Sequence, residues 1–155
     1  MILFLDFDGV LHPETVEQEN GLFCCCAHLW AVLDAVPAVE VVFTTTWRRK
    51  RRVEELVHLV TSGGGEHLAS RFIGATPEAL RNEFSDTYRS REVECLAWLY
   101  GNGQPWREWV AVDDIAYWFS FPQPRLVLID PATGLTANDA DRIVARLRQC
   151  GSSGK

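Results

Sequence analysis

Short apolar runs mark the strands that the sequence predicts. Residues 2–5 form a continuous apolar run, as expected of a strand buried in a parallel sheet. Similar runs at residues 40–43, 109–112 and 126–129 predict three further strands. A pair of apolar residues at 72–73 is too short to assign. The pattern therefore predicts four strands.

Helical periodicity fills the spans between these runs. Apolar residues recur at helical spacing over residues 22–36, 53–60 and 89–100, and each span predicts a helix. Thr136 and Asp139 form a capping-box pattern that predicts the start of a last helix. Because strands alternate with helices, we predict an α/β fold of three layers, α/β/α, with a mostly parallel sheet.

Length and composition fit one globular domain. The chain has 155 residues, of which 47% are hydrophobic and 23% are charged. We predict a single domain over residues 1–150 and a flexible tail or artificial extension at residues 151–155. The N-terminal apolar run meets Asp6 at once, without the basic leader of a signal peptide. Since no apolar stretch approaches the ~20 residues that span a membrane, we expect no membrane partner.

Cysteine content and charge narrow the location and the partners. The five cysteines, three of them consecutive, indicate no disulfide framework. Reduced thiols in a cytoplasmic protein are the simpler interpretation. The formal net charge of −6 weakly disfavours a dedicated nucleic-acid binder, which usually carries a basic face. It is compatible with a small phosphorylated substrate.

Three of the four predicted strands end in residues that can do chemistry. Asp6 and Asp8 follow the first strand, threonines at 44–46 follow the second, and Asp113 and Asp114 follow the third. In open α/β sheets the binding site lies outside the carboxyl ends of the strands. We therefore predict one site that is built from these residues.

The residues at these strand ends match the needs of phosphoryl transfer. The reaction needs a nucleophile, positive charge near the transferred oxygens and a proton for the leaving oxygen. One carboxylate can attack phosphorus, and a second can serve as general acid and then as base. Asp8 is well placed for the second task, and Gly9 would let backbone amides approach the phosphate. A cation from a later helix would balance the remaining charge.

The aspartates also predict a metal site. Carboxylates that converge on one point repel each other unless a hard cation lies among them, and oxygen ligands suit Mg²⁺. Asp6, Asp113 and Asp114 would hold this ion, and Asp8 could add its backbone carbonyl.

Residues 6–11, Asp-Phe-Asp-Gly-Val-Leu, match the signature Asp-x-Asp-Gly-[Val/Thr]-Leu of the haloacid dehalogenase (HAD) superfamily. Four further stretches, at residues 46–48, 73–77, 91–99 and 130–136, are similar to a bacterial and phage branch of that superfamily. This branch is related to phosphatase-like domains of RNA-repair proteins. The chain therefore resembles that branch over nearly its whole length.

The resemblance implies a Rossmann-like HAD fold and Mg²⁺-dependent hydrolysis of a phosphate monoester. Asp6 would be the nucleophile that forms an aspartyl-phosphate, and Asp8 would be the general acid and base. Aspartates at both positions favour a phosphatase over a dehalogenase, which lacks the second aspartate.

Two of the implied assignments stay open. The apolar strand that ends in threonines at 44–46 resembles the second motif of the superfamily, and residues 110–114 resemble the fourth. The hydroxyl group of the second motif would come from Thr45, or from Thr44 if the first hydroxyl after the strand governs. The third motif is usually a lysine or arginine before the fourth, and here it would be Arg91, with Arg89 as the alternative. The substrate would contact a set of residues near these motifs: Gly9, Thr44, Thr46 and Arg48.

The short spans between the motifs predict a minimal cap or none. An open site often goes with a large substrate, such as a nucleic-acid end or a protein, although a partner subunit could cover it instead. Two alternative functions remain. One is a phosphatase or phosphotransferase that processes nucleic-acid ends, and the other is a non-enzymatic module that binds phosphate or a protein. The oligomeric state is open.

Two further features lie near the predicted site. Five consecutive cations at residues 48–52 precede a predicted helix, where their charge opposes the helix macrodipole. A bound polyanion would relieve that cost, and a solvated charged face is the alternative. His12 follows the first motif and either contacts the substrate or is a loop histidine without a partner.

Overall fold

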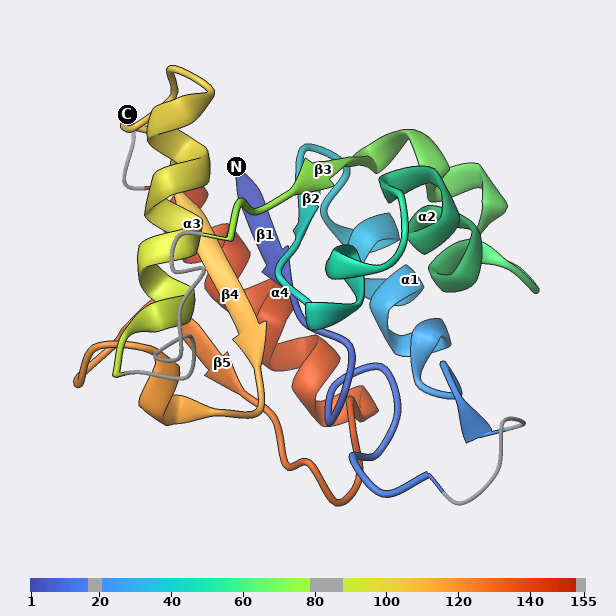
Figure 1. The fold of residues 1–155 in the computed structure, drawn as a ribbon. Helices are drawn as coiled ribbons and strands as arrows, with labels where there is room; N and C mark the ends of the chain where they lie inside the picture. The colour runs from blue at the N-terminus through green and yellow to red at the C-terminus, as the bar shows by residue number, and fades with distance from the viewer. Residues whose placement is uncertain (17–20, 79–87, 153–155) are drawn as a thin grey trace.

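The fold is that of a computed structural model, which describes residues 1–16, 21–78 and 88–152. Its centre is a five-stranded parallel sheet in the order β3-β2-β1-β4-β5 (Figure 1). The strands are β1 (Ile2–Leu5), β2 (Glu40–Phe43), β3 (Phe72–Ala75), β4 (Trp109–Asp113) and β5 (Leu126–Leu128). The predicted α/β class and parallel sheet are therefore confirmed.

Among the described residues, four α-helices and three short 3₁₀ segments connect or flank the strands. The helices are α1 (Cys26–Ala35), α2 (Val53–Thr61), α3 (Ser90–Gly101) and α4 (Ala137–Ser152). The 3₁₀ segments are η2 (Thr46–Arg49), η3 (Glu66–Arg71) and η4 (Ala116–Trp118). None of the helices in the described part of the chain combines the length and apolarity that a membrane span requires.

Alternate residues of β1 build two cores on opposite faces of the sheet. Leu3 and Leu5 belong to a core with residues of α1, α2 and α4, whereas Ile2 and Phe4 belong to a second core with residues of α3. All four side chains are fully buried, and burial of each contributes about 1.5–3 kcal/mol. The sheet is thus the middle layer of three, as predicted.

Most predicted boundaries shift by one residue at most, and larger differences occur at β3, α1 and α4. Residues 72–75, of which only 72–73 had an apolar signal, form the edge strand β3. Helix α1 begins at Cys26 rather than at residue 22, because Phe23 adopts a positive φ of 61° that a helix cannot contain. Helix α4 continues to Ser152, two residues past the predicted domain boundary, while residues 153–155 lie outside the described chain.

The connections near the sheet's carboxyl edge determine what covers that edge. The described residues between β1 and α1 form turns and an isolated bridge between Asp8 and His12, with no further domain among them. Residues 17–20 and 79–87, where a cap could also insert, lie outside the described part. The minimal cap therefore stays a prediction.

Candidate active site

Strand register brings the predicted site residues together. β1 pairs in register with β2 on one side and with β4 on the other. Asp6 directly follows β1, Thr44 directly follows β2, and Asp113 ends β4. These three residues therefore lie at neighbouring positions on the carboxyl edge of the sheet. Backbone hydrogen bonds extend the pairing to this edge, because the N–H of Asp6 donates to β4 and the N–H of Thr44 donates to β1.

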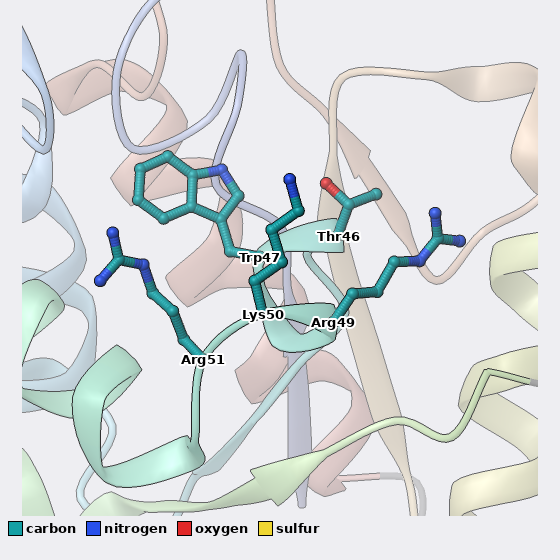
Figure 2. Close-up of a pocket in the computed structure, with 5 residues that line it drawn as sticks. All are labelled: Thr46, Trp47, Arg49, Lys50 and Arg51. Carbon is teal, nitrogen blue, oxygen red and sulfur yellow. The ribbon is translucent and has the colours of Figure 1, made fainter.

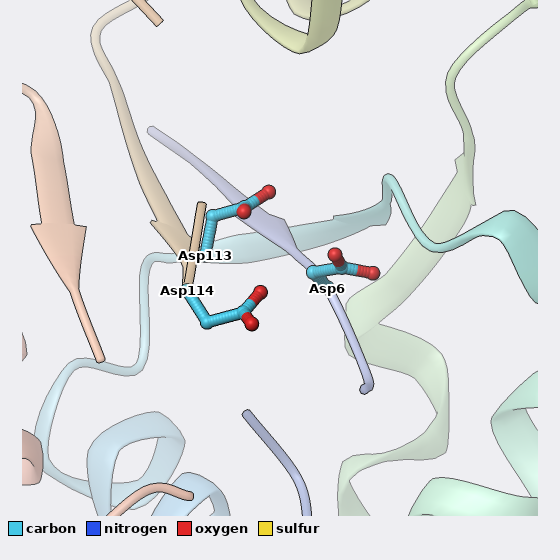
Figure 3. A group of neighbouring side chains, drawn as sticks. All are labelled: Asp6, Asp113 and Asp114. Atoms are coloured by element: carbon cyan, nitrogen blue, oxygen red, sulfur yellow. The ribbon is translucent and has the colours of Figure 1, made fainter. Parts of the chain in front are cut away.

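Three carboxylates meet at this edge. Oxygen atoms of Asp6, Asp113 and Asp114 all lie within 4.8 Å of one another (Figure 3). Asp6 is 5% exposed and Asp113 is 1% exposed, so two of the three carboxylates are almost inaccessible to solvent. Their proximity in a buried place requires either protons or a cation.

The electrostatics of the cluster indicate a cation site. Burial, and then the charge of Asp6, raises the pKa of Asp113 well above its usual range. Burial and Asp6 also raise the pKa of Asp114 to about 6. The Oδ1 atom of Asp113 accepts a hydrogen bond from the N–H of Ile115 at 2.9 Å, but its buried Oδ2 atom has no hydrogen-bond partner among the described residues. An orphaned carboxylate oxygen beside two further carboxylates is a donor set that fits Mg²⁺.

Arg91 from α3 balances part of this negative charge. Its Nη2 lies 3.6 Å from Oδ2 of Asp6, and its Nε lies 3.6 Å from Oδ2 of Asp113. Its Nη1 donates to the carbonyl of Thr44. Burial opposes the charge on Arg91, but the neighbouring acidic groups, Asp6, then Asp113 and then Glu94, together raise the pKa of this guanidinium. Arg89 instead lies exposed before the helix, so the geometry favours Arg91 as the third-motif cation.

Asp8 lies outside the cluster and is held by two donors. The indole N–H of Trp47 donates to both carboxylate oxygens of Asp8, at 3.0 and 3.2 Å. Nε2 of His12 lies 3.2 Å from Oδ1 of Asp8, while Nδ1 of His12 accepts from the N–H of Phe23 at 3.4 Å. His12 therefore carries its proton on Nε2 and donates it to Asp8. The bonds from His12 and then Trp47 lower the pKa of Asp8, although partial burial opposes them.

Comparison of the sequence with known protein families identifies one family that matches most of the chain. A sequence model of the family described as "HAD domain in Swiss Army Knife RNA repair proteins" matches residues 2–140. The chain belongs to this family. Membership supports a phosphatase-like or RNA-repair role for this HAD domain. No curated protein and no solved structure matches the chain.

Gly9 brings the first motif of the HAD domain against the carboxylate cluster. Its φ is +69°, a conformation that residues with a Cβ rarely adopt. A Cβ atom at this position would lie only 2.4 Å from Oδ2 of Asp114. The loop that carries Asp8 can therefore approach Asp114 this closely only with glycine at position 9.

The threonines of the HAD domain's second motif differ in their surroundings. Thr44 and Thr45 are buried, and Oγ1 of Thr45 accepts from the N–H of Trp47 at 3.3 Å. Thr46 is exposed at the start of η2. Whether Thr44 or Thr45 provides the phosphate-binding hydroxyl stays open. The role of the Asp8 carbonyl as a metal ligand and the individual catalytic roles remain predictions.

The side chain of Arg48 is tied to the protein by its own contacts. Its side chain is 5% exposed and points into the HAD domain. Nε donates to the carbonyl of Thr76 at 3.0 Å, Nη1 to the carbonyl of Thr45 at 2.6 Å, and Nη2 to Glu94 at 2.7 Å. Because all three guanidinium nitrogens of Arg48 donate to the protein, this side chain connects η2 to the end of β3 and to α3. The predicted contacts of Arg48 with a substrate and with a polyanion stay predictions.

Three of the other cations after the second motif line a hollow of about 430 Å³ on the HAD domain (Figure 2). The hollow is lined by residues of one short segment: Thr46, Trp47, Arg49, Lys50 and Arg51. Trp47 thus belongs both to the hollow and to the surroundings of Asp8.

Sequence reasoning missed His12 and Trp47 as partners of Asp8. His12 follows Asp8 by four residues, and Trp47 follows the second motif, so both were visible as neighbours of motifs. Their convergence on one carboxylate depends on how the first loop turns back toward β2, and a residue pattern does not encode that turn.

Proposed function

We propose that this chain is a Mg²⁺-dependent phosphohydrolase that cleaves a phosphate monoester through an aspartyl-phosphate at Asp6. One observation carries the proposal. Asp6 belongs to a carboxylate cluster that fits a cation, and it lies 3.6 Å from the buried guanidinium of Arg91, with Asp8 two residues further along the chain. This combination meets the three needs of phosphoryl transfer, which are a nucleophile, positive charge and a proton donor.

Asp6 is the nucleophile in this proposal. Its Oδ1 accepts the N–H of Phe7 at 2.8 Å, which fixes the orientation of the carboxylate. Attack by Asp6 on phosphorus forms a new P–O bond and breaks the bond to the leaving oxygen. When bound, Mg²⁺ would supply positive charge against the phosphate oxygens, and Asp6, Asp113 and Asp114 are the residues that would hold it.

Asp8 transfers the protons. In the first step a protonated Asp8 gives its proton to the leaving oxygen, and in the second it takes a proton from the water that attacks the aspartyl-phosphate. Inorganic phosphate and free Asp6 result. The two donors lower the pKa of Asp8 in the free protein, whereas the negative charge of a bound phosphate raises it again. Its half-exposed carboxylate gives water access for the second step.

Release of phosphate from an aryl phosphate tests the reaction. We expect the wild-type chain to release phosphate only with Mg²⁺, and Asp6→Asn to fall to the uncatalysed rate because asparagine cannot form the acyl-phosphate. Equal activity of the two proteins would exclude Asp6 as the nucleophile. Absence of activity on a wide panel, with Mg²⁺ binding intact, would instead favour the non-enzymatic binding module.

The leaving group distinguishes the role of Asp8 from a merely structural one. An alkyl alkoxide needs a proton more than an aryl oxide does, because it is the stronger base. We expect Asp8→Asn to lower kcat/KM, which reports formation of the aspartyl-phosphate and not its hydrolysis, by about 10²–10⁴-fold on an alkyl phosphate and by much less on an aryl phosphate. An equal loss on both substrates would contradict the general-acid assignment.

A second candidate function is end processing of nucleic acids, as a phosphatase or a phosphotransferase. The family description names RNA repair, and a basic hollow lies beside Asp8. A terminal phosphate of a strand would then be the group at Asp6. Faster release from phosphorylated oligonucleotides than from small monoesters would support this candidate.

We also propose a cytoplasmic location. All five cysteines are free thiols, and three of them are buried. Thiols persist in a reducing compartment. Detection of the protein in the cytoplasmic fraction with its thiols reduced would support this location.

A further inference from the structure

The proposed reaction leaves the basic hollow beside the site unused. Three cations, Arg49, Lys50 and Arg51, line it together with Trp47, and all three are exposed. The chain as a whole carries a net charge of −6, so this gathering of positive charge runs against its overall sign. Within the described part of the chain, one of these cations, Arg49, pairs with a carboxylate, that of Glu78 at 3.4 Å. Among the described residues, Lys50 and Arg51 form no ion pair with a carboxylate, so these two cations are available to a ligand.

Trp47 connects the hollow to the reacting groups. Its indole N–H donates to Asp8, while the same side chain lines the hollow. Figure 2 shows the side chains of Arg49, Lys50 and Arg51 on the same side of the turn as the indole ring. The guanidinium of Arg51 lies 5.5 Å from the centre of that ring. The side chain of Trp47 would thus separate an anionic group in the hollow from the carboxylate of Asp8, the proposed general acid.

The segment that forms the hollow is held in place by the protein itself. The inward guanidinium of Arg48 ties this turn to the end of β3 and to α3. The N–H of Trp47 is bonded to Oγ1 of Thr45, directly after β2. A prearranged set of cations binds an anion with a smaller entropic cost than a disordered charged loop would.

We propose that this hollow binds a second phosphate group of the substrate, so that the preferred substrate carries at least two phosphates. The inference rests on the proposed function, since the scissile phosphate is taken to lie at Asp6. Phosphate accepts several charge-assisted hydrogen bonds, which arginine and lysine provide. The second phosphate could belong to a small bisphosphorylated nucleoside or to the phosphodiester backbone of a nucleic-acid strand.

Substrate comparison tests the proposal. Phosphate release would be measured for adenosine 3′-monophosphate, adenosine 5′-monophosphate, adenosine 3′,5′-bisphosphate and a short oligonucleotide with a terminal phosphate. We expect kcat/KM to be at least about tenfold higher for the bisphosphate or the oligonucleotide than for either monophosphate, because one charge-assisted bond has this effect. No such preference in the wild-type protein would overturn the proposal.

Matched variants locate the preference. In the triple variant Arg49→Gln, Lys50→Gln, Arg51→Gln, the ratio of kcat/KM between the preferred substrate and the monophosphates should fall to about one. Arg52→Gln is the control, because Arg52 belongs to the same run but is not among the residues that line the hollow. Its side chain is 80% exposed, and we expect the preference to be retained. A triple variant that keeps the wild-type preference would contradict the proposal.

The two sources of the second phosphate give different results. A preference for the bisphosphate that does not increase with the oligonucleotide identifies a small substrate. A larger preference for the oligonucleotide, together with a salt dependence that becomes less steep in the triple variant, identifies a strand.

A binding measurement keeps this proposal separate from the proposed function. Asp6→Asn cannot turn over a substrate, so calorimetric titration of this variant with adenosine 3′,5′-bisphosphate reports binding alone. Addition of the triple substitution should weaken binding by about tenfold or more, and addition of Arg52→Gln should not. Catalysis without this loss of binding would sink the second-phosphate site alone. Binding without any catalysis would sink the proposed function alone.

Discussion

At the scale of single residues, the loop of the first motif is positioned by contacts on both of its sides. His12 and Trp47 hold the carboxylate of Asp8 on one side. On the other side Gly9 presents its bare Cα to Asp114, one of the three carboxylates of the proposed metal site. The segment from Asp6 to Gly9 therefore carries the proposed proton donor and one proposed metal ligand and contacts a second, Asp114, so a change at Gly9 is expected to disturb the metal side of the site.

Gly9→Ala tests this shared segment. The substitution places a Cβ atom 2.4 Å from Asp114 and forces alanine into a left-handed conformation, so we expect weaker Mg²⁺ binding and a loss of stability of about 1–3 kcal/mol. Gly103→Ala is the matched control, because Gly103 has a φ of +65° with no heavy atom within 4 Å of the added Cβ. The control should lose stability without losing Mg²⁺ affinity, as measured by urea unfolding and calorimetric titration. Equal Mg²⁺ affinities of wild type and Gly9→Ala would contradict this account.

At the scale of elements, the sequence predicted well what depends on local patterns. The apolar runs predicted β1, β2 and β4, because strands that are buried on both faces appear in a sequence as continuous apolar runs. Asp6 and Thr44 directly follow β1 and β2, and Asp113 ends β4. Strand β3 escaped prediction because it lies at the sheet edge and is only partly buried, so its pattern is weak. The inward turn of Arg48 was equally unpredictable, since it depends on carbonyls of distant elements.

Arg48 is expected to determine how firmly η2 is attached. Its guanidinium satisfies backbone carbonyls and Glu94 in a place with little access to water. We expect Arg48→Ala to lower the free energy of unfolding by about 2–4 kcal/mol, because it leaves a buried carboxylate with one fewer partner. The exposed neighbour Arg49→Ala should change it by less than about 0.5 kcal/mol. Urea unfolding of both variants measures the difference, and similar values for the two would refute the structural role.

At the scale of the whole molecule, the carboxylate cluster links protons, metal and stability. The pKa of Asp114 is about 6 in the folded chain, above its ordinary value of 3.8, because of burial and of Asp6. Between these two values the folded state binds more protons than the unfolded state. The free energy of unfolding of the metal-free protein therefore falls as the pH rises from about 4 to about 6. Bound Mg²⁺ would remove this penalty at neutral pH.

Asp114→Asn tests this linkage. Without metal at pH 7.5, we expect the variant to be more stable than wild type by about 1 kcal/mol, after allowance for solvent near a half-buried carboxylate. The difference should vanish near pH 3, where both proteins lack this charge. Addition of Mg²⁺ should stabilise wild type more than the variant. Urea unfolding in EDTA and in Mg²⁺ measures the free energy of unfolding of both proteins without and with the metal. A variant that is less stable than wild type in EDTA at pH 7.5 would contradict the account.

The account depends above all on a covalent bond between phosphate and Asp6. During turnover with a phosphate monoester and Mg²⁺, the reaction would be quenched with acid and the protein mapped by mass spectrometry after borohydride reduction, which converts an aspartyl-phosphate to homoserine. The account predicts homoserine at position 6 in wild type and none in Asp6→Asn. Turnover without any modification of Asp6, or with the modification at another aspartate, would contradict it.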